Sequence, residues 1–443
     1  MRLITCRRHA GLLLGLGLLT GLSIIACRDI TSLAQENPGS LSGTTLYVPG
    51  NAQLITNGAI ADFECAYARY VVGSGLFADE LSVGISNTGN FDYDARRLLT
   101  NATYGTNHCG ANPTPSSTQQ PGIYTPLSTA RATADTAAAY IEQWTDAQVV
   151  NRNKLLAQNY AYAGYSLALL GEGMCTAAIN LGPELQPAQL FAEAKIRFDK
   201  AITSATAAND ATTLNLARVG RARAQLDLGG PANLAAAAAD AALVPATFAV
   251  STSPDATNAR RQNALFINIS QSSFSTVDTS FRNVLVPGGT TQDPRVGVVD
   301  LARNGTATGS RIFLPAKAAT NATAMRIASY AEAQLIIAEN AAATGDLVGA
   351  TTAINNARAR TAGVPAYVLP AGATSATVLA QVIEERRREF FVEGHRLGDI
   401  RRTTIPFTPA AGAAYQYGGV YGTQTCFPLP DVERINNPTI AKP

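Results

Sequence analysis

The chain has 443 residues, of which 46% are hydrophobic and only 15% are charged. This length allows one large domain or two to three smaller ones, and the apolar content excludes a disordered chain. The formal net charge of +2, without long basic runs, excludes an electrostatic footprint for nucleic acid, and a total of three histidines excludes most histidine-rich metal sites.

Residues 1–26 predict a secretory signal peptide. Three arginines within the first eight residues precede an apolar stretch over 10–25. A transmembrane anchor is the alternative, but the apolar stretch is short and interrupted by glycine. The end of the stretch, Ile24-Ile25-Ala26-Cys27, resembles the lipobox of bacterial lipoproteins. This resemblance implies that the signal is removed and that Cys27 carries the lipid. Two or more acyl chains would then hold the protein stably on a membrane.

Four cysteines remain once the signal is removed and Cys27 is lipidated. In an oxidising compartment they suggest two disulfides, with three possible pairings. We expect Cys65–Cys109, which closes an interval of N-terminal loops. We also expect Cys175–Cys426, which ties the end of the chain to a helix that ends near Gly173. No CxxC spacing occurs, so we expect neither zinc binding nor thioredoxin-like chemistry. We predict no metal site and no cofactor.

After a linker over 27–58, rich in Ser, Gly, Asn and Thr, residues 59–443 are expected to form a single domain. Apolar residues at helical spacing predict helices over 128–149, 151–171, 189–206, 212–228, 232–243, 326–344, 347–361 and 375–393. Pairs of such helices with alternating small and large apolar residues are typical of tetratricopeptide-type packing, although the period is not a clean repeat of about 34 residues. A plain bundle of Ala-rich helices is the alternative.

Two portions, about 60–125 and 250–322, are rich in polar loops, with a few short strands in the second. Loops of this length are usually functional, so these portions are the expected ligand-binding surface. Tyr104 and Tyr124 are the candidate contacts, because tyrosine can stack on a sugar ring or hydrogen-bond to a peptide backbone. The sole tryptophan, Trp144, falls in a predicted scaffold helix.

The densest charge cluster lies between residues 384 and 402. Helical spacing places Glu384 beside Arg387 and Arg388, Glu385 beside Arg388, and Arg386 beside Glu389. A catalytic interpretation would use Glu389 and Glu393 as a carboxylate pair, with His395 as acid or base. We favour a structural interpretation, because arginines that crowd the acids keep their pKa values low. The predicted ion-pair lattice comprises Glu385, Arg386, Arg388, Glu389, Glu393 and Arg396.

Motifs for chemistry are absent from the sequence. There is no HExxH and no GxxxxGK[ST], and the segment around Ser166 is one residue short of GxSxG and lies within a predicted helix. We therefore expect a protein that is not an enzyme.

The stretch Glu385–Arg402 (ERRREFFVEGHRLGDIRR) resembles the C-terminal signature of the SusD/RagB family of outer-membrane nutrient-binding lipoproteins. Further segments occur in that family's order, namely Asp293-Pro294-Arg295, Arg326–Asn340, Ala353–Gly363 and Phe427–Pro430. The resemblance implies a mainly α fold, with a superhelical scaffold of tetratricopeptide-like helix pairs, long irregular loops and a few short strands. It also implies a partner, a SusC-like TonB-dependent outer-membrane transporter.

The predicted protein is thus lipid-anchored in the outer membrane of a bacterial cell and exposed at the surface. It binds an extracellular oligomer and delivers it to the transporter. Members that bind glycans typically stack sugars on aromatic side chains, often tryptophan, so the ligand stays open between an oligosaccharide and a peptide. A helical-repeat scaffold that binds only protein, and a secreted hydrolase, are the alternative functions.

Overall fold

The computed structural model describes residues 43–85, 90–109, 121–306 and 309–442. The chain divides into two units, 1–46 and 47–443. Within the described residues, the first unit contains the short helix α1 (Gly43–Leu46). The second unit holds all the other described elements, and the predicted mainly α fold is confirmed there.

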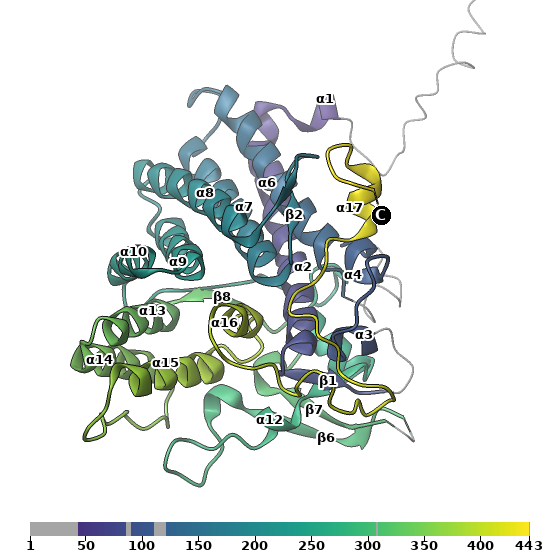
Figure 1. The fold of residues 1–443 in the computed structure, drawn as a ribbon. Helices are drawn as coiled ribbons and strands as arrows, with labels where there is room; N and C mark the ends of the chain where they lie inside the picture. The colour runs from purple at the N-terminus through teal and green to yellow at the C-terminus, as the bar shows by residue number, and fades with distance from the viewer. Residues whose placement is uncertain (1–42, 86–89, 110–120, 307–308, 443) are drawn as a thin grey trace, which may run out of the picture. The chain divides into compact units, whose positions relative to one another are not determined.

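A row of long helices forms the scaffold of the second unit (Figure 1). Along the chain each helix packs against its predecessor, because antiparallel neighbours bury their apolar faces together. The helices are α2 (Ala52–Phe77), α6 (Tyr124–Gln143), α7 (Arg152–Gly173), α8 (Pro187–Ala207), α9 (Ala211–Leu228) and α10 (Pro231–Ala242).

Small residues allow the close approach of these helices. The ring of Phe198 on α8 packs edge-on against Tyr165, with ring centroids 5.1 Å apart. Gly164 on α7 and Gly220 on α9 face the same ring, and a Cβ atom at either position would overlap it. This is the alternation of small and large residues that the sequence indicates.

A second helical group follows the loop-rich portion and packs against α10 and α9. It comprises α13 (Tyr330–Ala343), α14 (Leu347–Arg358), α15 (Ser375–Glu389) and α16 (Arg396–Arg402). The buried side chains of Arg223 and Glu332 join α9 to α13 through hydrogen bonds of 2.6 and 2.8 Å. The helix predicted from residue 326 starts later, because 326–329 form a strand that pairs with residues 249–251.

The strands are short and pair in twos, all antiparallel. The pairs are β1 (Leu81–Val83) with β5 (Ser275–Val277), β2 (Ala177–Ala178) with β3 (Glu184–Leu185), β4 (Ala249–Ser251) with β8 (Arg326–Ser329), and β6 (Val298–Asn304) with β7 (Arg311–Pro315). Thr276 links β5 to β7, since its hydroxyl donates to the Arg311 carbonyl and accepts from the Phe313 amide.

Short helices punctuate the loops between these elements. They are α3 (Phe91–Asp94), α4 (Thr103–Thr106), α11 (Ala264–Phe266), α12 (Thr279–Arg282) and α17 (Asp431–Asn436), with 3-10 turns at Pro49–Asn51, Pro294–Val296 and Ala316–Ala318 and a π turn at Ile267–Gln271. The portion 250–322 thus has the expected loops and short strands.

Two predicted boundaries are wrong at the N-terminal side. The linker expected over 27–58 ends earlier, because α2 already begins at Ala52. The loop-rich portion expected over 60–125 begins later, because α2 continues to Phe77. From residue 63 to its end α2 is buried on every side, so it lacks the polar face that marks a helix in a sequence.

Candidate functional site

The two tyrosines predicted to contact the ligand are buried in the structure, against the exposure that stacking on a ligand requires. Tyr104 on α4 is 0% exposed, and its hydroxyl donates to the Pro428 carbonyl at 2.7 Å. Tyr124 at the start of α6 is 2% exposed, and its hydroxyl accepts from the Ala178 amide at 3.3 Å. The Tyr104 ring lies against the ring of Phe427, with centroids 5.9 Å apart, so it is not free to stack on a ligand. Tyr124 is one of the residues that line a hollow beside α6 and α17.

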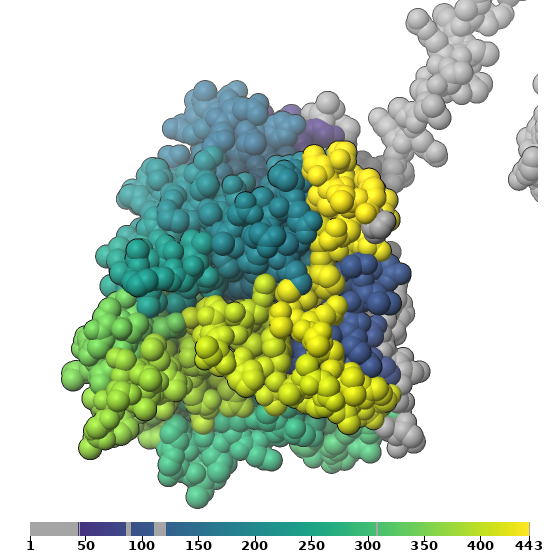
Figure 2. Space-filling view, in the orientation of Figure 1, coloured from purple at the N-terminus to yellow at the C-terminus, as the bar shows by residue number. Residues whose placement is uncertain are grey.

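Three segments that are distant in sequence come together elsewhere in a loop cluster. We define it by the described residues 81–85 and 90–98 of the first segment, 273–306 and 309–315 of the second, and 407–424 of the third. The β1–β5 pair joins the first two segments. The Gly422 amide donates to the Ala95 carbonyl at 2.7 Å, which joins the third segment to the first. In Figure 2 the C-terminal tail lies in yellow at the surface, against the dark blue segment that follows α2.

A stacked aromatic pair lies at the surface of the loop cluster. The rings of Phe91 and Tyr417 are 4.7 Å apart and nearly parallel, at 12°. Both residues are half-buried, so part of each ring is open to solvent. The Tyr417 hydroxyl lies 3.4 Å from that of Ser310, so the middle segment of the cluster reaches the pair.

Two consecutive arginines, Arg96 and Arg97, attach the tail to the first segment of the loop cluster. The guanidinium of Arg96 lies between two tail rings, 5.2 Å from the centroid of Phe407 and 5.0 Å from that of Tyr421. It also donates to the Pro409 carbonyl. Arg97 lies over the ring of Tyr415 at 5.4 Å. Such cation–π contacts give the irregular tail a fixed position.

The buried carboxylate of Asp94 joins the first and third segments of the loop cluster. Its Oδ2 accepts from the Val83 amide at 2.9 Å and from the Tyr415 hydroxyl at 3.2 Å. Burial raises the pKa of this carboxyl to about 7, and the two hydrogen bonds offset only part of that rise. The buried hydrogen bonds of Asp94 thus fix the segments that carry the aromatic pair, since Phe91 shares α3 with Asp94 and Tyr417 lies two residues after Tyr415.

The charged segment after residue 384 is mostly buried, and its partners lie far away in sequence. Only the local pairs of Glu384 with Arg387 and Arg388 form as helical spacing predicts. Glu385 does not meet Arg388. It accepts instead from Arg295 at 2.6 Å and from the Nε of Arg358 at 3.0 Å. Burial alone would raise the pKa of Glu385, but Arg358 and Arg295 outweigh it and hold that pKa below its usual value.

Arg386 likewise turns away from Glu389 and binds Asp399, with both oxygens 2.9 Å from its Nε. Arg326 from β8 binds Glu389 at 2.9 Å and the Glu393 carboxylate at 2.8 Å. These pairs fasten the end of α15 and the following turn to neighbouring elements.

The last two predicted members of the lattice reach the loop-rich portions. Arg388 binds Asp293 at 3.1 Å, close to the start of the 3-10 turn at Pro294–Val296. Arg396 binds Asp79, two residues before β1, at 2.6 Å. The lattice therefore positions both segments that feed the loop cluster.

An acid–base role for the same residues does not fit their surroundings. The ring of His395 stacks on Phe390, with centroids 4.3 Å apart, and the residue is 5% exposed. Burial, together with Arg223 and Arg386, places the pKa of His395 well below its usual value, so the ring stays neutral. Glu393 is held ionised, because Arg326 and Lys317 outweigh the effect of burial on its pKa.

The structure joins the cysteines in the pairing that we expect from the sequence. Cys65 in the middle of α2 is bonded to Cys109, with Cα atoms 6.2 Å apart. Cys175, two residues after α7, is bonded to Cys426 in the tail, with Cα atoms 5.0 Å apart.

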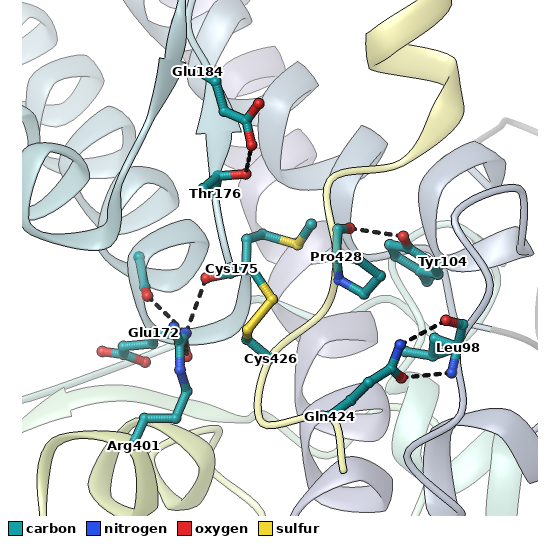
Figure 3. Close-up of a disulfide and its surroundings, with 12 residues drawn as sticks. Leu98, Tyr104, Glu172, Cys175, Thr176, Glu184, Arg401, Gln424, Cys426 and Pro428 are labelled. Atoms are coloured by element: carbon teal, nitrogen blue, oxygen red, sulfur yellow. Dashed lines mark hydrogen bonds between the residues drawn. A yellow bond between two sulfur atoms is a disulfide. The ribbon is translucent and has the colours of Figure 1, made fainter. Parts of the chain in front are cut away.

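The second disulfide belongs to a larger seam between α7 and the tail (Figure 3). Arg401 donates to the carbonyls of Gly171, Glu172 and Met174, and so supplies a donor to acceptors at the C-terminal end of α7 that have no partner within a helix. On the other side of the disulfide, the Gln424 side chain exchanges two hydrogen bonds with the backbone of Leu98, at 2.6 and 2.8 Å.

Two further predictions concern membranes and metals. Cys27 and the signal over 1–26 lie outside the described residues. None of the described helices combines the length and the apolar character needed to cross a membrane. Within the same part of the chain, no three His, Cys, Asp or Glu side chains gather where they could hold a metal ion.

Residues 315–436, which include α13 to α17 and the charged segment, match the model of the SusD family. The predicted resemblance to this family is confirmed. No curated protein matches the chain.

Solved structures extend the likeness from the SusD family segment to most of the chain. A surface glycan-binding protein A from Bacteroides fluxus has a TM-score of 0.65 at 15% identity, covering 89% of this chain and 98% of its own. A SusD-like carbohydrate binding protein from Bacteroides vulgatus has a TM-score of 0.60 at 14% identity, with coverages of 89% and 97%. A SusD superfamily protein from Parabacteroides distasonis has a TM-score of 0.64 at 13% identity, with coverages of 91% and 99%. At these identities the likeness shows the fold.

Sequence reasoning missed Phe91 and the tail aromatics as site residues. A signal exists for the tail, where Tyr415, Tyr417 and Tyr421 surround Gly418-Gly419. Alternating aromatic residues around a glycine pair are typical of a turn that presents side chains on one side. The glycines have φ values of 102° and 76°, which is the region that favours glycine.

Proposed function

We propose that the protein is a lipid-anchored protein of the bacterial outer membrane that binds an extracellular oligosaccharide on its loop cluster. It delivers the oligosaccharide to a TonB-dependent transporter and carries out no chemistry of its own. The observation that carries the proposal is the half-buried Phe91–Tyr417 pair beside the buried hydrogen bonds of Asp94. The SusD family segment, and the glycan-binding proteins that share the fold, support it.

The chemistry of the pair suits a sugar. Aromatic rings offer apolar area at low conformational cost, and a few polar groups beside them fix the orientation of a ligand. Here the polar groups are the hydroxyls of Tyr417 and Ser310 and the side chain of Arg97. An open surface of this kind gives modest affinity, with a Kd near about 1 μM, or about −8 kcal/mol.

A lipid anchor offsets that modest affinity. A protein tethered beside the mouth of a transporter holds its ligand at a high effective concentration there, so tight binding is not needed for delivery. A ligand held too tightly would also leave slowly, since affinity is tuned mostly through the dissociation rate.

Calorimetry of the full chain in detergent tests the proposal, with panels of neutral and acidic oligosaccharides and of peptides. We expect an oligosaccharide to bind without turnover, and Tyr417→Ala to weaken it at least about tenfold, or about 1.4 kcal/mol. Tyr367→Ala is the matched control, because that half-buried tyrosine lies after α14, outside the loop cluster. Turnover of any panel member, binding of peptides alone, or equal effects of both variants would refute the proposal.

Delivery is tested separately by purifying the lipoprotein from its native membranes with a mild detergent. We expect a TonB-dependent transporter to co-purify. Recovery of the lipoprotein alone, after cross-linking in intact cells, would refute the delivery step but not ligand binding.

A further inference from the structure

A second aromatic group lies at the far end of α6, away from the loop cluster. The rings of Tyr47 and Tyr140 stack 4.3 Å apart at 10°, and Trp144 lies 6.4 Å from Tyr140. Tyr140 is 36% exposed, and Tyr47 and Trp144 are half-buried. We call these three residues the α6 platform. Trp144 directly follows the last turn of α6, so it is a surface residue rather than part of the scaffold core.

A groove of about 410 Å³ runs beside the platform, between α6 and α8, with Tyr160 of α7 among the residues that line it. Thr136 and Ala139 of α6 line this groove. Tyr140 lies one turn beyond Thr136, so the platform borders the groove at the edge that Thr136 forms. Trp144 lies next to Tyr140 at the end of α6.

The groove also continues in the other direction along α6. A second hollow, of about 370 Å³, shares Arg131, Ala132 and Asn180 with the first and reaches α17. The two hollows and the platform thus follow α6 for most of its length. An extended chain fits such a surface better than a compact small molecule does.

The charges in the groove are paired with one another. Asp135 accepts from Arg131 and from Arg197, both at 3.3 Å. Glu142 accepts from Lys200 at 3.4 Å and from the hydroxyl of Tyr160. The groove is lined by three cationic side chains, Arg131, Arg197 and Lys200, and by the two acids Asp135 and Glu142. A third acid, Glu193, lies outside the lining and binds Arg197. A wall without excess charge gives no electrostatic attraction for an anionic or cationic polymer, but its fixed polar groups can hydrogen-bond to hydroxyls.

We propose that the α6 platform and its groove form a second binding site, for a neutral oligosaccharide. The rings of the platform stack on sugar faces, and the paired charges of the groove hydrogen-bond to hydroxyls. This inference rests on the proposed function for the class of ligand, but the site is separate from the loop cluster and uses none of its residues.

The chain provides its own reporter for this site. Trp144 is the only tryptophan, so selectively excited fluorescence reports on the platform alone. The experiment titrates the full chain in detergent with maltoheptaose, cellohexaose, xylohexaose, laminarihexaose and mannohexaose. Concentrations extend to about 10 mM, above the ~1 mM Kd that marks weak binding. Polygalacturonate and a peptide panel are the charged and non-glycan probes.

We expect at least one neutral oligosaccharide to change the emission of Trp144 in the wild type and in Tyr417→Ala. Tyr140→Ala should abolish that change and lower the calorimetric stoichiometry from two to one. Trp144→Phe keeps an aromatic ring, so it should retain calorimetric binding at the platform while losing the signal.

Several results overturn the inference while leaving the proposed function in place. One is that every neutral oligosaccharide that binds in a Tyr417-dependent manner leaves Trp144 emission unchanged. Another is that Tyr417→Ala abolishes the emission change while Tyr140→Ala preserves it. A response to peptides alone, or a stronger response to polygalacturonate, would assign the platform to another class of ligand. If no probe binds by either method, both the inference and the proposed function fail.

Discussion

Arg396 and Asp79 lie 317 residues apart and form two hydrogen bonds, of 2.7 and 2.6 Å. Directly beside them, the Val392 amide donates to the Glu80 carboxyl at 2.7 Å. The segment 315–436, which matches the SusD family model, thus binds the chain where it leaves α2 and enters β1. Its charged residues place the first strand of the loop cluster, so they support the proposed ligand surface from within the protein.

We predict that Arg396→Ala lowers the free energy of unfolding by about 3–5 kcal/mol, because it leaves Asp79 buried without its partner. Both side chains of this pair are less than a tenth exposed, at 8% and 6%. Urea denaturation followed by far-UV circular dichroism measures the effect. A value within about 1 kcal/mol of the wild type would contradict the prediction.

The matched control for that change is Arg311→Ala. Arg311 and Asp300 also form two hydrogen bonds, at 2.8 and 3.1 Å, but their side chains are 42% and 44% exposed. Because solvent screens such a pair, its loss costs no more than about 1 kcal/mol.

A second prediction concerns the disulfides. Peptide mapping without reduction should recover Cys65 linked to Cys109 and Cys175 linked to Cys426, and any crossed pairing would contradict the structure. Cross-links stabilise mainly by restricting the unfolded chain, and the restriction grows with the enclosed length. The separations are 44 and 251 residues. Replacing both Cys175 and Cys426 by Ala should therefore cost about 1.5 kcal/mol more than replacing both Cys65 and Cys109.

A third prediction concerns pH and the carboxyls of Glu172 on α7 and Asp227 on α9. Each has an oxygen that is buried without a hydrogen-bond partner. Burial, and then the neighbouring Asp227, raise the pKa of Glu172 well above its usual value, and burial raises the pKa of Asp227 to about 6. The folded state therefore holds a proton that the unfolded state releases.

Because these pKa values are raised on folding, their stabilising effect is complete below about pH 4 and is lost as the pH rises through the folded values. We expect the free energy of unfolding to fall between about pH 5 and pH 8, by at most about 1.4 kcal/mol per pH unit for each proton that the folded state retains. Glu172→Gln mimics the protonated acid, so its stability should vary less over the same range. Parallel pH profiles of the wild type and the variant would contradict this prediction.

A fourth prediction concerns the anchor. Since Cys27 follows a signal and a lipobox-like tetrapeptide, Cys27→Ser should abolish acylation and release the protein from the membrane fraction. The measurement is fractionation of cells that lack the transporter, with metabolic labelling by a fatty acid. A variant that stays in the membrane fraction of these cells would contradict lipid anchoring.

Helix α8 could be predicted from the sequence, because it keeps an apolar stripe at helical spacing. Phe191, Ala194, Phe198, Ala201 and Ala205 are all buried on one face of α8, as the spacing indicates. The central helix α2 could not be delimited in this way, since its neighbours cover it on every side from Phe63 onward. Propensity and periodicity are weak signals for a helix without a polar face.

The candidate ligand surface could be predicted less well from the sequence than the scaffold. Whether a loop tyrosine is exposed depends on which distant segment covers it, and the tail residue Phe427 lies against Tyr104 with ring centroids 5.9 Å apart. The same limit applies to charges. Local spacing identified the partners of Glu384, but the partners of Glu385 come from positions 295 and 358. Spacing along one helix cannot show such long-range pairs.

The stretch from α16 to Cys426 is attached to the scaffold at both ends. Arg401 of α16 binds the end of α7, and Cys426 is bonded to Cys175 just after α7. Peptidases on a cell surface attack exposed irregular chain first, and this stretch carries the tail aromatics at the surface. A single cut before Cys426 leaves the terminal fragment, with α17, covalently attached to the scaffold. A nicked molecule therefore keeps its C-terminal piece, and the damage becomes visible as a second band only after reduction.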